Sequence, residues 1–173
     1  MHGKVYQINI KSQVPGERGL PKYPVPWAMF TKQGVLGLGR HPDWNIYRFE
    51  QKEVDPADRA VSVYSLELIT ELQENGWPAM QPGDIGENLT TKGILYADFA
   101  AGQRWQVGEA IIRLTIPATP CGVLAQLPYV GMEKKAAFKQ ALTGCRGWYA
   151  AVELEGIVTD GADCALLSRK SSE

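Results

Sequence analysis

The 173-residue sequence predicts a mainly β domain of the α+β class, barrel-like and with a few helices. Many short apolar stretches are bounded by glycine and proline, and no strand–helix–strand rhythm repeats along the chain. Only two segments have their apolar residues at helical spacing. Because no internal repeat, low-complexity tract or long linker divides the chain, we expect a single domain over residues 1–173.

The first third of the chain is expected to consist of short strands broken by loops. Val5, Ile8 and Ile10 mark a first strand. Residues 14–26 are rich in proline and glycine, and we expect an irregular connection there rather than a strand. Residues 27–41 are typical of strand segments that bend at glycines, and the polar residues 41–59 are expected to form a surface loop.

Two helices are expected. The first spans residues 65–76, with Ser65 as its N-cap and Gly76 where a C-terminal cap belongs. Its apolar positions recur at helical spacing: Leu66, Ile69 and Leu72. The second spans about residues 132–142, with an inner side of Ala136, Ala137, Phe138 and Leu142. The charged residues of this second helix are expected on a solvated face: Glu133, Lys134, Lys135 and Lys139.

The remaining elements are expected to be strands. RWQV and AIIRLTI are separated by Gly108-Glu109, and two such residues are typical of a tight hairpin turn. Two further strands are expected after the second helix, in GWYAAVELEG and near ADCALLS, with a turn at Asp160-Gly161.

Composition narrows the function classes. A formal net charge of -1 argues against a general nucleic-acid binder, which needs a basic surface to neutralise phosphates. The N-terminus lacks a basic region followed by a long apolar run, and no stretch approaches the roughly 18 apolar residues of a membrane span. We therefore expect a soluble, cytoplasmic protein with neither a nucleic acid nor a membrane as partner.

The three cysteines are Cys121, Cys145 and Cys164. An odd number without a CxxC pair fits neither a disulfide framework nor a metal clip, so three free thiols are expected. With only two histidines in the chain, we do not expect a zinc site.

Cys121 follows Thr119-Pro120 at the end of an apolar strand. Proline should turn the chain sharply there and present the thiol, although burial as a small apolar side chain is the alternative. Because a free thiol is mostly protonated at neutral pH, chemistry at this position needs a nearby cation or a metal. Candidate cations are Lys22, Arg40, Arg113 and Arg146. Cys145 and Cys164 are expected to be packing residues.

Two further segments carry candidate ligand-binding groups. In QPGDIGENLTTKGI, residues 81–94, Glu87 and Asn88 supply a carboxylate and an amide, which can orient a substrate or fasten the loop to another element. Spacing leaves both possibilities open. Arg146 precedes Gly147 and can hold a phosphate or carboxylate ligand, or pair with a surface acid.

Taken in order, six segments resemble the MOSC domain family, named for the C-terminal part of molybdenum-cofactor sulfurases. The segments are GLPKYPV, GLGRHPD, RAVSVYS, PGDIGENLTTKGI, TPCGVL and CRGWYAAVELEGIVTDGA. The similarity spans almost the whole chain and is strongest to small stand-alone bacterial members. It implies a MOSC-type β-barrel that is similar to the pyruvate-kinase barrel.

The resemblance also implies a site at Cys121. This cysteine either carries sulfur as a persulfide or, in molybdenum-dependent members, ligates the metal of the molybdenum cofactor. The implied cofactor-binding residues are Lys22, Arg40, His41, Glu87, Asn88 and Arg146. Lys22, Arg40 and Arg146 would hold the pterin phosphate, whereas Glu87 and Asn88 would shape the pocket floor. The chain departs from related sequences at Ala118, where an arginine is frequent, and at Leu38-Gly39, where a Gly-Asp pair is frequent.

The function that this resemblance implies is a sulfurtransferase-like, sulfur-handling enzyme or sulfur carrier linked to the molybdenum cofactor. Its partners would be a sulfur donor, either a desulfurase or a small molecule, and an anionic small-molecule or pterin ligand. One alternative is a molybdenum-cofactor-dependent oxidoreductase that reduces N-hydroxylated compounds. The other is a non-catalytic pterin- or anion-binding module. The sequence does not indicate an oligomeric state.

Overall fold

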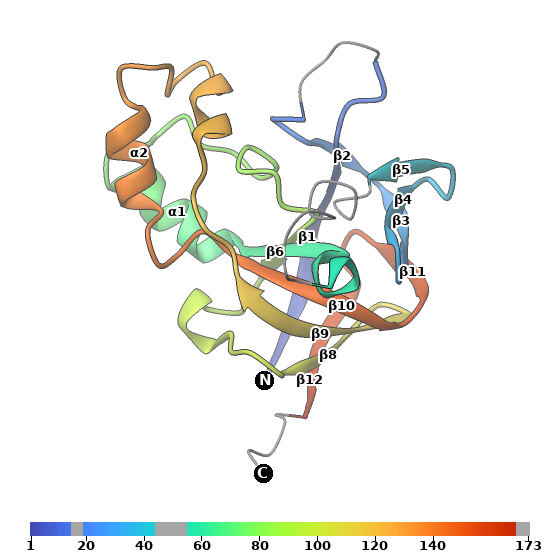
Figure 1. Cartoon of the computed structure of the whole chain (residues 1–173). Coiled ribbons are helices and arrows are strands. Elements are labelled where there is room, and N and C mark those ends of the chain that lie inside the picture. Colours follow the sequence, from blue (N-terminus) through green and yellow to red (C-terminus); the bar gives the residue numbers. More distant parts are fainter. Residues whose placement is uncertain (15–18, 44–54, 169–173) are drawn as a thin grey trace.

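The computed structural model describes residues 1–14, 19–43 and 55–168. Figure 1 shows a strongly curved sheet with the two α-helices at one end and a small second sheet on the opposite side. The strands are β1 (His2–Ile10), β2 (Tyr23–Val25), β3 (Trp27–Thr31), β4 (Gly34–Gly37), β5 (His41–Asp43), β6 (Val61–Ser65), β7 (Leu89–Lys92), β8 (Arg104–Val107), β9 (Ala110–Pro117), β10 (Trp148–Leu154), β11 (Gly156–Thr159) and β12 (Asp163–Ser168). The α-helices are α1 (Leu66–Glu74) and α2 (Lys135–Ala141). Short 3-10 helices are η2 (Pro56–Arg59), η3 (Tyr96–Asp98) and η4 (Gly122–Gln126).

The large sheet closes into a barrel. Seven strands follow one another in the order β12-β8-β9-β10-β6-β7-β1, and β1 pairs back with β12 through His2–Ala165 and Lys4–Asp163. β2 adds to the outside of this ring by pairing with β1, and β6 and β7 form its parallel pair. Closure removes the open edges of the sheet. The predicted mainly β, barrel-like fold is therefore confirmed.

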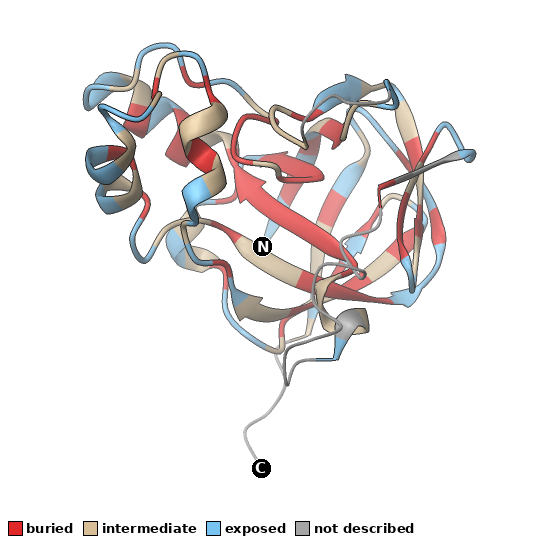
Figure 2. Ribbon diagram, turned by 45° about the horizontal axis from the view of Figure 1, so that its top comes forward, coloured by how far each residue is buried: buried red, intermediate tan, exposed pale blue. Residues whose placement is uncertain are grey.

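The second sheet has the order β11-β3-β4-β5, with every neighbouring pair antiparallel. Its inner face is apolar and buried, and comprises Ala28, Phe30, Val35 and Val158. This face packs against the same apolar cluster that fills the barrel. Figure 2 shows the resulting band of buried residues along the inward faces of the strands.

A second apolar cluster lies under the helices. It joins α1, α2 and η4 through buried side chains that include Leu68, Ile69, Leu72, Leu124, Phe138 and Leu142. Phe138 packs between the rings of Trp77 and Tyr129, at centroid distances of 4.6 and 5.9 Å. Because these rings hold α2 against the end of the barrel, the cluster sets the position of α2 relative to η4.

Local signals in the sequence located several elements correctly. The Ser65 hydroxyl accepts a hydrogen bond from the Leu68 N–H at 3.2 Å, which is the expected N-cap of α1. Gly76, just beyond the helix, has a φ of 102°, as its place at the C-terminal end predicts. The expected hairpin pairs Val107 with Ala110 across Gly108-Glu109.

Other expectations were wrong in detail. Residues 14–26 include β2, because the backbone of Tyr23–Val25 pairs with β1. Residues 41–59 include β5 and η2, and the part of that expected loop at 44–54 lies outside the described residues. The segment after α2 forms three strands instead of two, because β11 turns away from β10 to pair with β3.

The second helix is shorter than predicted. α2 begins at Lys135 and not at 132, and Ala136 and Ala137 are exposed, whereas Phe138 and Leu142 form the buried side. Met132 has 75% of its surface exposed and lies in the turn that precedes the helix. Neither α1 nor α2 is long and apolar enough to cross a membrane, and the same holds for every helix within the described ranges.

Candidate functional site

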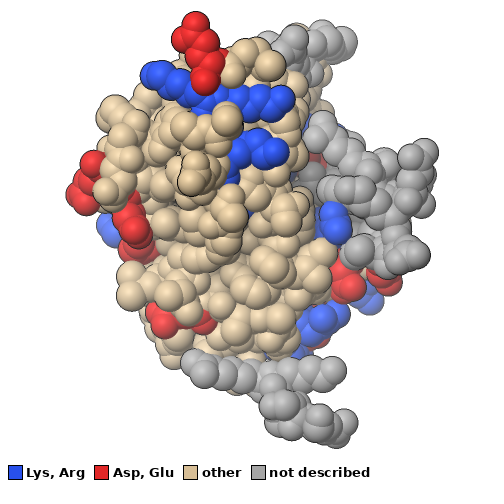
Figure 3. All heavy atoms as spheres, turned by 60° about the vertical axis from the view of Figure 1, so that its left-hand side comes forward, with Lys and Arg blue, Asp and Glu red and all other residues tan. Residues whose placement is uncertain are grey.

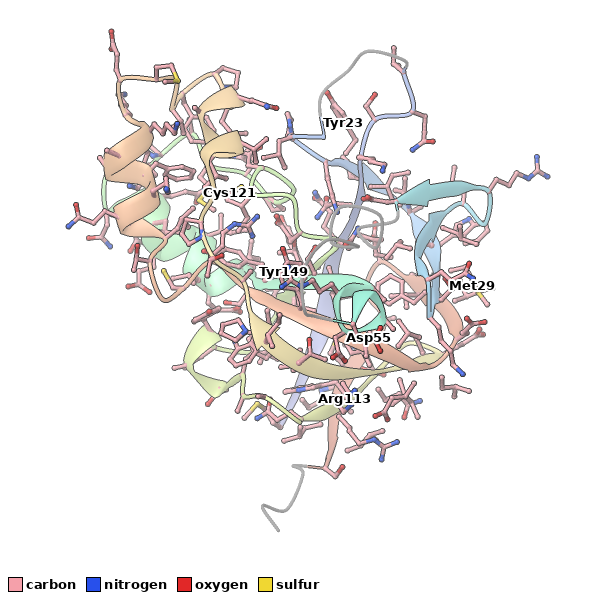
Figure 4. The ribbon with its side chains drawn as sticks, viewed as in Figure 1. Tyr23, Met29, Asp55, Arg113, Cys121 and Tyr149 are labelled. Carbon is pink, nitrogen blue, oxygen red and sulfur yellow. The ribbon has the colours of Figure 1, made fainter. Side chains whose placement is uncertain are left out.

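Cys121 lies on the segment that leaves the barrel at the end of β9. The Ala118 N–H donates to the Gly147 carbonyl at 2.8 Å, so this segment lies against the residues that lead into β10. Cys121 itself has an extended backbone, with φ -122° and ψ 171°, and is the N-cap residue of η4. Its thiol is exposed, and Figure 4 places it between the end of the barrel and the helices. The prediction that the Thr119-Pro120 turn presents this thiol is in accord with that position.

The other two thiols are less accessible. Cys164 is buried in the barrel core, and burial raises the pKa of its thiol to about 12. Cys145 is half-buried, its Sγ donates to the Ala141 carbonyl at 3.2 Å, and burial raises its pKa as well. Because the thiolate is the reactive form, neither environment favours sulfur chemistry.

Glu87 is a buried carboxylate in the loop that precedes β7. Its Oε1 accepts hydrogen bonds from the Gly83 N–H at 2.6 Å and the Thr90 hydroxyl at 3.0 Å. Its Oε2 is buried and has no hydrogen-bond partner among the residues that the structure describes. Burial raises the pKa of Glu87, against the opposing effect of these hydrogen bonds and of the Arg146 guanidinium.

Glycine is required at position 83 to bring this loop close to its neighbour. Gly83 has a φ of 93°, and a Cβ on it would collide with the Lys22 carbonyl. In return, the Lys22 N–H donates to the Gly83 carbonyl at 2.9 Å. The loop that carries Glu87 is thereby tied to the segment before β2.

Arg146 and Tyr64 complete a polar group around Glu87. The Arg146 Nη2 donates to the Ile85 carbonyl, whereas its Nε is buried without a hydrogen-bond partner in the described ranges. The Tyr64 hydroxyl is also buried and has no hydrogen-bond partner in the described part of the chain, and burial raises the pKa of this phenol. Arg146 acts on the ionisation of both Tyr64 and Glu87, so the three side chains are electrostatic neighbours. We call Tyr64, Glu87 and Arg146 the polar floor of the candidate site.

Lys22 and Asp43 form a buried ion pair, with 2.9 Å between Nζ and Oδ2. The same Oδ2 accepts hydrogen bonds from the Lys11 N–H and from Asn88 Nδ2, each at 3.0 Å. Burial opposes ionisation of Asp43, but Lys22 and the Lys11 N–H outweigh it, so the pKa of Asp43 lies below its ordinary value. Burial lowers the pKa of Lys22 despite its partner. The ammonium of Lys22 is thus directed at a carboxylate within the protein.

The Asn88 side chain connects three strands. Its Oδ1 accepts from the Ser62 N–H at 3.2 Å and the Ser62 hydroxyl at 2.9 Å, and its Nδ2 donates to the Asn9 carbonyl at 3.2 Å as well as to Asp43. Ser62 lies on β6, Asn9 on β1 and Asp43 on β5. Of the two roles that the sequence left open for this amide, fastening the loop is the one that these contacts perform.

The remaining predicted residues lie elsewhere. Arg40 is exposed in the turn between β4 and β5, on the opposite side of the molecule from η4 in Figure 1. His41 lies in β5, and its side chain is outside what the structure describes. Arg113 is held by Glu153 at 3.2 Å and Asp58 at 3.4 Å, and Figure 4 places it far from Cys121.

Lys135 is a cation near Cys121 that the sequence did not single out, because its helix was expected to present it on a solvated face. A Cβ added to Gly122 would lie 3.5 Å from Lys135 Nζ. Figure 3 shows lysine and arginine side chains gathered at the top of the face turned toward the viewer, at the level of α2 and η4. Only the packing of α2 against η4 reveals this proximity.

No group of three or more histidine, cysteine, aspartate or glutamate side chains is arranged to hold a metal ion in residues 1–14, 19–43 and 55–168. A metal at this site would therefore depend on the Cys121 sulfur and on ligands supplied by a cofactor.

Comparison with known proteins places this architecture in a family. The family described as MOSC domain matches residues 37–164. The chain is 34% identical to the uncharacterized protein YflK of Bacillus subtilis (strain 168) over 112 residues, which are 65% of this chain and 49% of that protein. This chain thus aligns with about half the length of YflK.

Solved structures share the fold. YuaD from Bacillus subtilis superposes with a TM-score of 0.76 at 20% identity, covering 95% of this chain and 94% of that one. YiiM from Geobacillus stearothermophilus gives a TM-score of 0.72 at 24% identity, covering 98% of this chain and 77% of that one. YiiM from Escherichia coli gives 0.64 at 23% identity, covering 99% and 72%. These likenesses confirm the predicted barrel.

Proposed function

This chain belongs to the MOSC domain family, and from that premise we propose that it is a sulfur-handling protein in which Cys121 carries sulfane sulfur. The observation that carries the proposal is the contrast among the three thiols. Cys121 is exposed at the start of η4, whereas Cys145 is half-buried and Cys164 is buried in the barrel core. A donor molecule can therefore approach Cys121 directly.

The transfer chemistry needs only the thiolate and a donor. The Cys121 thiolate attacks the outer sulfur of a donor persulfide, R–S–S⁻. The Sγ–S bond forms, the donor S–S bond breaks, and the donor leaves as the thiolate R–S⁻. Cys121 then carries the persulfide anion, and the reverse exchange passes the sulfur to an acceptor thiolate. No oxidant, reductant or metal is consumed in either direction.

Arg146 of the polar floor is linked to the Cys121 segment through the backbone of its neighbour Gly147, and we infer that this arginine serves an anionic ligand. Arg146 contributes a buried Nε–H that has no hydrogen-bond partner within residues 1–14, 19–43 and 55–168. The next residue, Gly147, accepts a hydrogen bond from the Ala118 N–H of the Cys121 segment. An arginine with an unused donor is suited to a carboxylate, phosphate or sulfur oxyanion. The floor also offers Glu87 Oε2 as an acceptor, so a ligand that presents both an anion and a donor group fits best.

The molybdenum-cofactor alternative fits this donor set less well. The Cys121 thiolate is a soft ligand of the kind that suits molybdenum, and the cofactor would supply redox chemistry at that sulfur. The phosphate of the pterin, however, needs converging cations. Lys22 is buried against Asp43 and Arg40 is exposed on the β4–β5 turn, so two of the three cations predicted for this role do not converge with Arg146.

The proposal is tested by loading the protein with sulfur. Purified protein is incubated with a persulfide donor, and the Cys121 peptide is analysed by mass spectrometry under non-reducing conditions. The expected result is the added mass of one sulfur atom on Cys121, lost on treatment with a reductant. Cys145→Ser serves as the matched control and should load normally, whereas Cys121→Ser should not load. An unmodified Cys121 peptide at donor concentrations that load a free peptide thiol would overturn the proposal.

A further inference from the structure

We propose that Lys135 binds the negative charge of the sulfur species at Cys121, which makes this a site for small anionic sulfane-sulfur donors. The inference rests on the proposed function, because it concerns the donor that Cys121 accepts. Lys135 lies in α2, a helix that contains none of the site residues predicted from the sequence.

The geometry at Gly122 carries the inference. Gly122 directly follows Cys121, and a Cβ added to it would lie 3.5 Å from Lys135 Nζ and 3.6 Å from Lys135 Cε. The end of the lysine side chain therefore rests against the first residue of η4, within van der Waals contact of a side chain at that position. Lys135 is half-buried in this position.

Packing between the helices keeps Lys135 in this position. Phe138, one turn further along α2, and Leu124 of η4 are fully buried in the same apolar cluster. Because both helices are anchored in one cluster, the start of α2 cannot move away from η4 without opening it. The lysine ammonium is thus presented beside the Cys121 turn by the fold and not by a flexible loop.

The charge of Lys135 is also not neutralised within the described ranges 1–14, 19–43 and 55–168. No carboxylate there lies within 4.0 Å of its Nζ, although six such ion pairs or histidine contacts occur elsewhere. By contrast, Lys22 is paired with Asp43, and Arg146 is bonded to the Ile85 carbonyl. Lys135 can therefore direct its charge at a ligand.

The chemistry defines the class of donor. With thiosulfate, the Cys121 thiolate attacks the outer sulfur, the S–S bond breaks, and sulfite leaves with the electron pair. The products are the Cys121 persulfide anion and sulfite, so atoms and charge balance. Both the incoming dianion and the persulfide anion bear negative charge next to the sulfur that reacts. An ammonium at this place favours anionic donors over neutral ones of the same reactivity.

The test measures the electrostatic potential at Cys121 without any sulfur transfer. Iodoacetate and iodoacetamide alkylate the same thiolate but differ by one negative charge. Their rate constants are followed at the Cys121 peptide by mass spectrometry. In Lys135→Gln, the ratio of the iodoacetate to the iodoacetamide rate constant should fall by at least about fivefold, which is the effect of two unit charges about 4 Å apart when water screens them fully. High salt should shrink the difference between the two proteins.

The matched control is Lys134→Gln, which removes the same charge from an exposed neighbour. Lys134→Gln should leave the ratio of rate constants within about twofold of that of the unmodified protein. Lys135→Arg keeps the positive charge and should retain most of the preference for iodoacetate. Circular dichroism verifies that each variant is folded. An unchanged ratio in folded Lys135→Gln overturns the inference, whether or not Cys121 takes up sulfur. A fallen ratio supports it even if the sulfur-loading experiment fails, so the two proposals are tested separately.

Discussion

Replacing Lys22 by methionine tests whether this buried lysine stabilises the protein through Asp43. The change keeps the length and apolar stem of the side chain and removes the ammonium that lies 2.9 Å from Asp43 Oδ2. Asp43 is 1% exposed, so its charge would remain buried without a counter-ion. Removing one partner of a buried pair typically costs about 3–5 kcal/mol.

The remaining contacts of Asp43 set the expected magnitude. Its Oδ2 still accepts from the Lys11 N–H and from Asn88 Nδ2, each at 3.0 Å. Two retained hydrogen bonds place the loss of unfolding free energy near the lower end of that range, at about 3 kcal/mol. For a domain of this size, such a loss lowers the melting temperature by about 6–12 °C.

Urea unfolding monitored by tryptophan fluorescence measures this loss, since the chain contains five tryptophans. The matched control is Lys4→Met, which removes a lysine from an ion pair of 2.6 Å with Asp163 that is about half exposed. That variant should lose no more than about 1 kcal/mol. Equal losses in the two variants, each under about 1 kcal/mol, would refute the view that the Lys22–Asp43 pair holds this region together.

The pH dependence of the Lys22 variant provides a second check. In the unmodified protein the pKa of Asp43 lies below its ordinary value of 3.8, so its contribution is present above that pH and is lost as the pH falls through the folded-state pKa. Without Lys22, burial dominates and raises the folded-state pKa above the unfolded one. The variant then gains stability relative to the unmodified protein as the pH falls. The deficit should therefore be smaller at pH 4 than at pH 7.

Two further predictions concern the loop before β7. Asn88→Ala should lower the free energy of unfolding by about 3 kcal/mol, because it leaves the Ser62, Asn9 and Asp43 groups without their shared partner. The control is Gln13→Ala, at an exposed side chain, which should change the free energy of unfolding by less than about 0.5 kcal/mol. Glu87→Gln should change the pH dependence of urea unfolding. Burial raises the pKa of Glu87 in the folded state, so the unmodified protein loses stability as the pH rises through that pKa. This loss of stability should be absent from the variant. Identical slopes for the two proteins between pH 4.5 and 7 would contradict a buried, ionisable Glu87.

Features that depend on neighbouring residues in the chain were predictable. Ser65 caps α1 through a hydrogen bond that spans three residues, and Gly108-Glu109 closes a hairpin between adjacent strands. Pro120 turns the chain directly before Cys121, which is why an exposed thiol could be anticipated there. In each case the stabilising contact lies within a few residues, so the sequence displays both partners at once.

The roles of charged and polar side chains were less predictable. Lys22 and Arg40 both qualified as ligand-binding cations by residue type, yet one is buried against Asp43 and the other is exposed in a turn of the second sheet. Lys135 was expected on a solvated face because it is charged, and only the packing of α2 on η4 brings its ammonium to Gly122.

The amino-acid sequence by itself determined the strand-rich architecture and the cap of α1, since turns, caps and periodicity depend on short segments, whereas it left exposure and burial of Cys121 both open. The tertiary structure alone decided that the Asn88 side chain bonds to Ser62, Asp43 and Asn9, which lie 26, 45 and 79 positions away in the sequence. It also decided that the end of the Lys135 side chain lies against Gly122. Such contacts form only when the barrel closes and α2 packs on η4. Their partners are set by three-dimensional packing, which residue types and local spacing do not encode.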